Sequence, residues 1–200
     1  MGESERMYET DNKSLYEAVF KQRTLFLDVF MVMVSVAFMA LMANIRIPLW
    51  PVPITMQTFG VFLIAFFFGS RKGFLAMLAY VLAGLVGFGV FAGYKSGIGA
   101  LIGPTGGYIV GFIFMVLIVG WMIEKGYGRT KKSVLMCMIV GEIVLYTFGL
   151  AGLWFYLGDV SFAEVLMKGF VPFVIGDSVK ALGSIALFPY LWKGAEKISQ

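Results

Sequence analysis

Long apolar runs recur along the whole chain, and most charged residues lie in the short segments between them. The first run, residues 29–45, contains 17 residues without a charged side chain and lies between Asp28 and Arg46. A helix that crosses a bilayer needs roughly 20 predominantly apolar residues, because the hydrocarbon core is about 30 Å thick. This run therefore predicts a spanning helix over about residues 26–45.

Five further apolar runs follow the first one. Prolines at positions 48, 51 and 53 favour an extended loop, because proline lacks the N–H group that a helix needs. The second span is expected to begin near Ile54 or Thr55 and to stop before Arg71 and Lys72. The other predicted spans are residues 73–91, a segment that follows the glycine-rich residues 93–107 and ends near Ile123, residues 133–157 and residues 169–192.

These runs predict an all-α integral membrane protein in which six transmembrane helices form one compact bundle over residues 26–192. Residues 1–25 are expected to be a cytoplasmic segment whose first dozen residues look disordered. Residues 14–21 would form a helix in the membrane surface, because their apolar side chains share one face. Residues 193–200 are expected to be a cytoplasmic tail, and no cleavable signal peptide is expected because the leading segment lacks an apolar core.

Basic residues are divided unevenly between the two sides of the predicted bundle. Twelve of the 16 Lys and Arg residues fall on the side that holds both termini, and only Arg46, Lys95 and Lys168 fall on the other side. Cytoplasmic loops hold the excess of Lys and Arg in membrane proteins. We therefore expect a multi-pass protein of the cell membrane with both termini in the cytoplasm, and topology explains the net charge of +4 without a nucleic-acid partner.

The composition agrees with a lipid environment and argues against an enzyme. The chain is 60% hydrophobic and 14% charged, whereas soluble domains are about 45–50% apolar and about 25% charged. It has no His, which removes imidazole metal ligands and His-activated nucleophiles, and its single Cys137 cannot form an internal disulfide. We find no nucleotide-binding loop or nucleophile motif, so neither a catalytic activity nor a cofactor is expected.

Three charged residues lie inside the last two predicted spans, residues 133–157 and 169–192, where a charge costs about 2.5–3.5 kcal/mol on insertion scales. Asp177 and Lys180 are three residues apart and share one helix face. They form either an ion pair that neutralises itself or a polar cluster beside a cavity that is open to the outside. Glu142 lies near the middle of its span, and a structural role is as plausible for it as a ligand-binding role.

The outward loops carry the remaining polar candidates. Thr55, Gln57 and Thr58 either cap the second span or turn inward. Lys95 is either a solvated loop charge or a cation near a ligand. The segment around Thr105 reads either as a helix opening with free backbone N–H groups or as a plain turn.

Five segments resemble the BioY family, in the order in which that family has them. They are Pro51-Val52-Pro53-Ile54-Thr55-Met56-Gln57-Thr58, Tyr80 with Gly84 and Gly87, Val90-Phe91-Ala92-Gly93, Gly103-Pro104-Thr105-Gly106-Gly107-Tyr108, and Pro172-Phe173 followed by Gly176-Asp177 and Lys180-Ala181. The resemblance covers about residues 47–187. Some members have Asn after Phe-Ala, where this chain has Gly93.

The resemblance implies a six-helix subunit of an energy-coupling-factor (ECF) transporter that binds biotin with high affinity on its extracellular side. It also implies two kinds of partner, a transmembrane coupling protein and a pair of cytoplasmic ATPases. The family's Asp-x-x-Lys motif falls on Asp177 and Lys180. Asp177 would accept from the ureido N–H groups, and Lys180 would donate to either the ureido oxygen or the carboxylate, so the orientation of biotin stays open. Further candidates are Lys95 and the amides near Thr105 for the carboxylate, Tyr80, Phe91, Tyr108 and Tyr146 around the ring, and Thr55 and Gln57 as polar groups.

Two other functions stay open at this point. One is a subunit of the same type for a different small vitamin, which a competition panel would distinguish. The other is an intramembrane enzyme that uses Glu142 and Asp177 as acid and base, which would form a product from a lipid or peptide.

Overall fold

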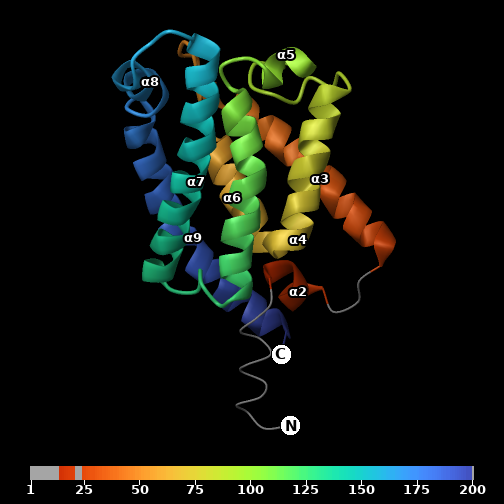
Figure 1. Ribbon diagram of the computed structural model, residues 1–200. Helices are drawn as coiled ribbons and strands as arrows, with labels where there is room; N and C mark the ends of the chain where they lie inside the picture. The colour runs from red at the N-terminus through yellow and green to blue at the C-terminus, as the bar shows by residue number, and fades with distance from the viewer. Residues whose placement is uncertain (1–13, 21–23, 200) are drawn as a thin grey trace.

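The protein is a bundle of long helices capped at one end by short elements (Figure 1). The computed structural model describes residues 14–20 and 24–199. The helices are α2 (Leu15–Val19), α3 (Leu25–Asn44), α4 (Gln57–Leu85), α5 (Ile98–Leu101), α6 (Gly106–Glu124), α7 (Lys131–Leu157), α8 (Phe162–Gly169) and α9 (Phe173–Ser199). Two short strands, β1 (Arg46–Ile47) and β2 (Ile54–Thr55), pair antiparallel between α3 and α4.

Five helices are long and apolar enough to cross a membrane: α3, α4, α6, α7 and the part of α9 from Phe173 to Gly194. The protein is therefore a mostly helical, multi-pass membrane protein. The sequence predicted six spans, and the difference arises at α4, because the predicted second and third spans both fall within this one helix.

Helix α4 is broken at Gly69, which has φ of 73° and ψ of −163°. This region of backbone space is essentially restricted to glycine. The chain turns at the lower end of α4 in Figure 1, so that the two halves of the helix are separate helical segments. The Glu124 carboxylate at the end of α6 accepts hydrogen bonds from the Ser70 N–H at 2.7 Å and the Ser70 hydroxyl at 2.8 Å, and so caps the second half.

Several predicted boundaries are wrong by a few residues. The predicted third span ends at Leu85 and not at residue 91, because the glycine-rich residues that follow turn the chain into a loop. The second span begins at Gln57, since residues 54–55 pair with β1 instead.

The C-terminal boundaries differ as well. The sixth span begins at Phe173, because Gly169 ends the separate short helix α8, and α9 continues through the predicted tail to Ser199. The predicted disorder of the first dozen residues lies outside the described part of the chain.

Glycines allow the central helices to approach closely. A Cβ at Gly107 of α6 would lie 2.9 Å from Gly152 Cα of α7, and a Cβ at Gly73 of α4 would lie 2.8 Å from Val116 Cγ2 of α6. Small residues serve this purpose in membrane bundles, where interhelical packing drives association. Helices α4, α6 and α7 therefore form the packed centre of the bundle, with α3 against α4 and α9 against α7.

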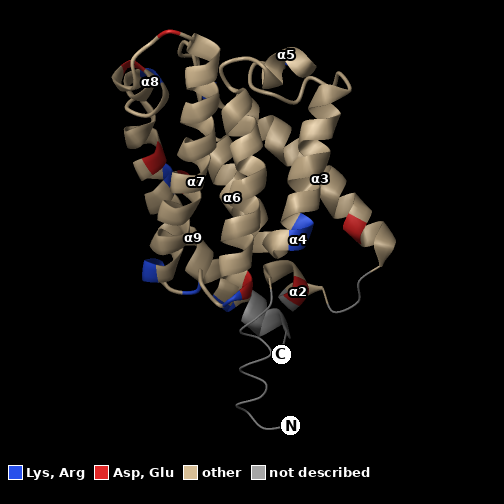
Figure 2. Cartoon of the chain, viewed as in Figure 1, with Lys and Arg blue, Asp and Glu red and all other residues tan. Residues whose placement is uncertain are grey.

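Charged residues are concentrated at the end of the bundle where α9 ends (Figure 2). There the Lys72 ammonium lies 2.6 Å from Asp28 Oδ1 and 4.2 Å from the centroid of the Tyr16 ring. The predicted helix at residues 14–21 is present as α2, and its Leu15 and Tyr16 side chains are buried against the bundle.

Candidate functional site

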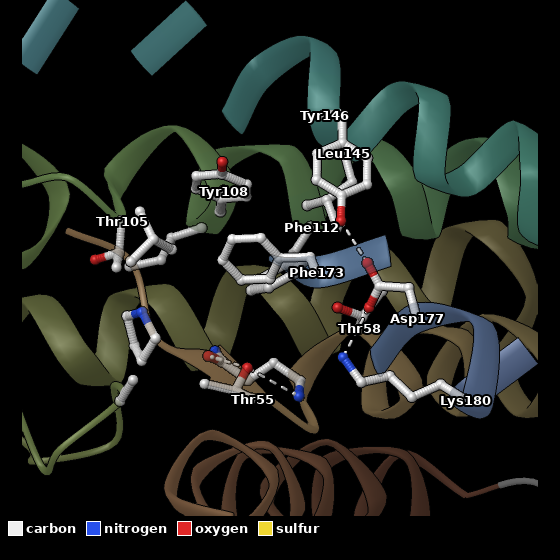
Figure 3. A pocket seen from close by; sticks show the side chains of 15 residues that line it. Thr55, Thr58, Thr105, Tyr108, Phe112, Leu145, Tyr146, Phe173, Asp177 and Lys180 are labelled. Carbon is white, nitrogen blue, oxygen red and sulfur yellow. Dashed lines mark hydrogen bonds and ion pairs between the residues drawn. The ribbon is translucent and has the colours of Figure 1, made fainter. Parts of the chain in front are cut away.

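A cavity lined by residues of α4, α6, α7 and α9 reaches a group of loops (Figure 3). These loops lie at the end of the bundle opposite α2 (Figure 1). Asp177, Lys180 and Tyr146 line one end of the cavity, which we call the charged end. Pro53, Ala92 and Thr105 come from loops and line what we call the loop end. Figure 3 shows Thr105 far from Asp177 and Lys180, with aromatic rings between them.

The charged end is held by two contacts to Asp177. Lys180 Nζ lies 2.8 Å from Asp177 Oδ1, and the Tyr146 hydroxyl of α7 donates to Asp177 Oδ2. The side chains of Lys180 and Asp177 are only 7% and 12% exposed. The two sequence-based alternatives are therefore compatible, because the residues form an ion pair and this pair also faces the cavity. Each carboxylate oxygen keeps a lone pair for a ligand donor.

A chain of hydrogen bonds supports the α4 side of the cavity. The Thr55 hydroxyl accepts from the Gln57 N–H at 3.2 Å and donates to Gln57 Oε1 at 3.1 Å. Gln57 Nε2 donates to the Tyr80 hydroxyl at 3.0 Å, and that hydroxyl donates to the Val90 carbonyl at 3.0 Å. The N-cap of α4 is Met56, which has no side-chain cap, and Thr55 lies one residue before it, binds the first N–H group of the helix and lines the cavity.

Aromatic rings form the middle of the cavity. Tyr108 of α6 and Phe173 of α9 are nearly parallel, with centroids 6.2 Å apart, and Phe112 lies beside them in Figure 3. Phe112 and Phe173 are not among the site residues predicted from the sequence. Helical spacing could have found both, because Phe112 is four residues after Tyr108 and Phe173 is four residues before Asp177.

The glycines beside Thr105 serve helix packing. A Cβ at Gly106 or Gly107 would collide with the Leu101 or Phe148 carbonyl oxygen, so α6 can begin here only with glycine. Thr105 itself lines the cavity, and its hydroxyl donates to the Ala100 carbonyl at 3.4 Å.

Seven of the ten predicted site residues line the cavity: Thr55, Gln57, Thr105, Tyr108, Tyr146, Asp177 and Lys180. The other three, Tyr80, Phe91 and Lys95, do not. Phe91 is 2% exposed and packs edge-on against Tyr80 at 5.5 Å, over Gly84, so these rings support the cavity wall from behind. Lys95 is exposed on the loop, where its carbonyl accepts from the Phe91 N–H.

Glu142 lies outside this cavity. It lines a mainly apolar groove between α7, α8 and α9, and its buried Oε2 atom has no hydrogen-bond partner among residues 14–20 and 24–199. Asp177 and Tyr146 border both the groove and the cavity, so their hydrogen bond is part of the wall between them. The described residues contain no group of three or more acidic, Cys or His residues that could hold a metal ion.

Comparisons with known proteins agree with this architecture. A biotin transporter BioY of Thermotoga maritima is 43% identical over 141 residues, which cover 69% of this chain and 79% of that protein. A probable biotin transporter BioY of Pyrococcus horikoshii is 35% identical over 161 residues, which cover 80% of this chain and 93% of that protein.

A crystal structure at 2.1 Å, described as the S-component for biotin from an ECF-type ABC transporter, has the same fold. The match has a TM-score of 0.71 at 22% identity and covers 86% of this chain and 95% of that one. The family profile described as BioY family matches residues 14–197. This chain is therefore a member of the BioY family.

Proposed function

We propose that the protein is the biotin-binding subunit of an ECF-type vitamin uptake transporter and that the cavity holds biotin. One observation carries the proposal: in a chain of the BioY family, a buried Asp177–Lys180 pair faces a cavity that opens toward the loops. No catalytic step is proposed, since the relatives are named as transporters.

The chemistry of biotin matches the two kinds of side chain that line the cavity, a charged pair and aromatic rings. Its ureido group has two N–H donors and a carbonyl acceptor, which suit the Asp177 carboxylate and the Lys180 ammonium. Its apolar ring system suits the space beside Tyr108, Phe112 and Phe173. A site built to hydrogen-bond a ligand group rejects analogues without that group by as much as about 10⁴–10⁵.

The proposed topology has six membrane crossings, with each half of α4 counted as one crossing because the backbone breaks at Gly69. The α2 end of the bundle, which holds Arg71, Lys72, Lys131 and Lys132, would face the cytoplasm. The loop end of the cavity would then face the outside of the cell membrane. The proposed partners, a transmembrane coupling protein and an ATPase pair, would supply the energy for uptake.

Cysteine labelling tests this topology. In a Cys137→Ser background, Lys95→Cys is expected to react with a membrane-impermeant thiol reagent in intact cells, and Lys132→Cys only after lysis. The reverse pattern would contradict the proposed orientation. Co-purification of an ATPase pair with the tagged chain from its native membrane tests the proposed partners.

Radiolabelled biotin binding to the purified protein tests the proposed site. Asp177→Asn and Lys180→Ala are expected to weaken binding strongly. Lys168→Ala is the matched control, because Lys168 forms a 2.6 Å ion pair with Glu164 that lies outside the cavity. Unchanged affinity in both cavity variants would refute the site, and preferential binding of another vitamin in a competition panel would refute the substrate.

A further inference from the structure

Arg46 is an exposed residue beside the loop end of the cavity, and it contacts the residues that form this end without lining the cavity itself. Its Cα pairs with that of Thr55 across the β1–β2 strands, so the two side chains project from the same face. A Cβ at Gly93 would lie only 3.2 Å from Arg46 Cζ, so the guanidinium group rests directly on the Gly93 backbone. Thr55 and Ala92, the residue before Gly93, both line the cavity.

The chain holds Arg46 and Gly93 together through α3. The Asn44 side-chain oxygen accepts hydrogen bonds from the Gly93 N–H at 3.0 Å and the Tyr94 N–H at 3.1 Å. Gly93 has φ of 76°, which favours glycine, and its lack of a Cβ leaves room for the guanidinium plane. The end of α3 and the loop of residues 86–97 therefore hold an exposed cation next to the loop end of the cavity, beside Thr55 and Ala92.

Arg46 also has hydrogen-bonding capacity to offer. No side chain or backbone group in residues 14–20 and 24–199 forms a hydrogen bond or ion pair with its guanidinium group. Lys168, another cation at this end of the bundle, is already paired with Glu164 at 2.6 Å. A guanidinium group has five donors in a planar fork that matches a carboxylate.

The charged end of the cavity is unsuitable for an anionic ligand group. The Lys180 charge is already compensated by Asp177, and Glu142 on α7 borders the same groove as Asp177. A carboxylate placed there would meet one or two like charges in a site of low polarity, which is unfavourable because the buried ion loses its hydration without gaining a partner. A neutral group with N–H donors meets acceptors instead.

We propose that Arg46 binds the carboxylate of the ligand at the loop end, and that biotin therefore lies with its ureido group toward Asp177 and its valerate chain toward the loops. This inference rests on the proposed function, and it adds the orientation of the ligand and a residue that selects for its charge. Arg46 thus distinguishes the free acid from neutral derivatives of the same ring system.

The test compares biotin with biotinamide, which keeps the ureido ring and replaces the carboxylate by a neutral amide. Wild-type protein is expected to bind biotin about 10-fold more tightly than biotinamide, since one charge-assisted contact contributes about 1.4 kcal/mol. Arg46→Ala is expected to lose this preference by weakening biotin about 10-fold while leaving biotinamide affinity unchanged. Retained biotinamide affinity also shows that the variant is folded. Arg46→Lys should retain part of the preference.

Each outcome separates the orientation from the proposed function. If wild-type protein binds neither compound, the proposed function fails. If it binds biotin and Arg46→Ala keeps the full preference for the acid, biotin binding stands and the role of Arg46 is refuted. Lys95→Ala, a nearby exposed cation, is the control. Loss of the preference in Lys95→Ala and not in Arg46→Ala would assign the carboxylate to Lys95 and overturn the inference.

Discussion

Separate removal of each member of the Asp177–Lys180 pair is expected to cost far more stability than removal of both. Asp177 is the only described hydrogen-bond or ion-pair partner of the Lys180 ammonium, and the Lys180 side chain is 7% exposed. Asp177→Asn therefore leaves a buried charge without compensation, which typically costs about 3–5 kcal/mol. Lys180→Met should cost less, because Asp177 keeps its hydrogen bond from Tyr146. The double variant, Asp177→Asn with Lys180→Met, buries no net charge. We expect its free energy of unfolding to lie within about 1–2 kcal/mol of the wild-type value.

The two roles of the pair can be separated in one set of variants. Cys137 is the only cysteine and is buried, so its reaction with a thiol-reactive dye reports thermal or SDS-induced unfolding. Biotin binding is measured on the same preparations. The double variant should regain most of the stability that each single variant loses, but none of the binding. Each lost charged hydrogen bond to the ligand raises Kd by about 10- to 150-fold.

Two results would contradict this reasoning. A double variant whose destabilisation equals the sum of the single variants would show that the charges do not compensate each other. A stable double variant that binds biotin as tightly as wild type would show that the pair is purely structural.

Three further predictions concern the architecture around the cavity. Gly69→Ala is expected to destabilise the protein by about 1–3 kcal/mol, because alanine is strained at φ of 73° and its Cβ would meet the Glu124 carboxylate. Cys137 labelling should show this loss of stability. An unchanged unfolding midpoint would argue against the break in α4. Glu124→Gln should cost about 1 kcal/mol in the same assay, because the amide cannot offer a charge-assisted cap to Ser70, whereas Lys168→Ala should leave the midpoint unchanged. Gly107→Ala should reduce the yield of monodisperse protein, since its Cβ would collide with the Phe148 carbonyl, while Gly99→Ala, at an open position without a positive φ, tests whether glycine loss alone has this effect. Equal yields of these two variants would refute the close approach of α6 and α7.

Some features of the site could be predicted from neighbouring residues alone. Asp177 and Lys180 stand out because charges are costly in lipid, and their spacing already places them on one helix face. Helices α3, α6 and α7 begin or end within one or two residues of the prediction, because the length of an apolar run is set by the thickness of the membrane. The predicted end of the second span before Arg71 agrees with the break in α4, but the position of the break at Gly69 depends on the Glu124 carboxylate, 54 positions after Ser70.

The remaining features required the tertiary structure. Tyr80 and Phe91 were predicted from the sequence to contact the ligand, yet their rings pack against each other behind the cavity wall. The Phe91 ring fits there because Gly84 has no side chain. The contact of Arg46 with Gly93 and the hydrogen bond of Tyr146 to Asp177 join positions that are 47 and 31 residues apart. By itself the sequence determined that the chain spans a membrane and which charged residues need a partner there. Only the packing of α4, α6, α7 and α9 decided which side chains face a common space, because that depends on how closely the glycines of one helix approach another.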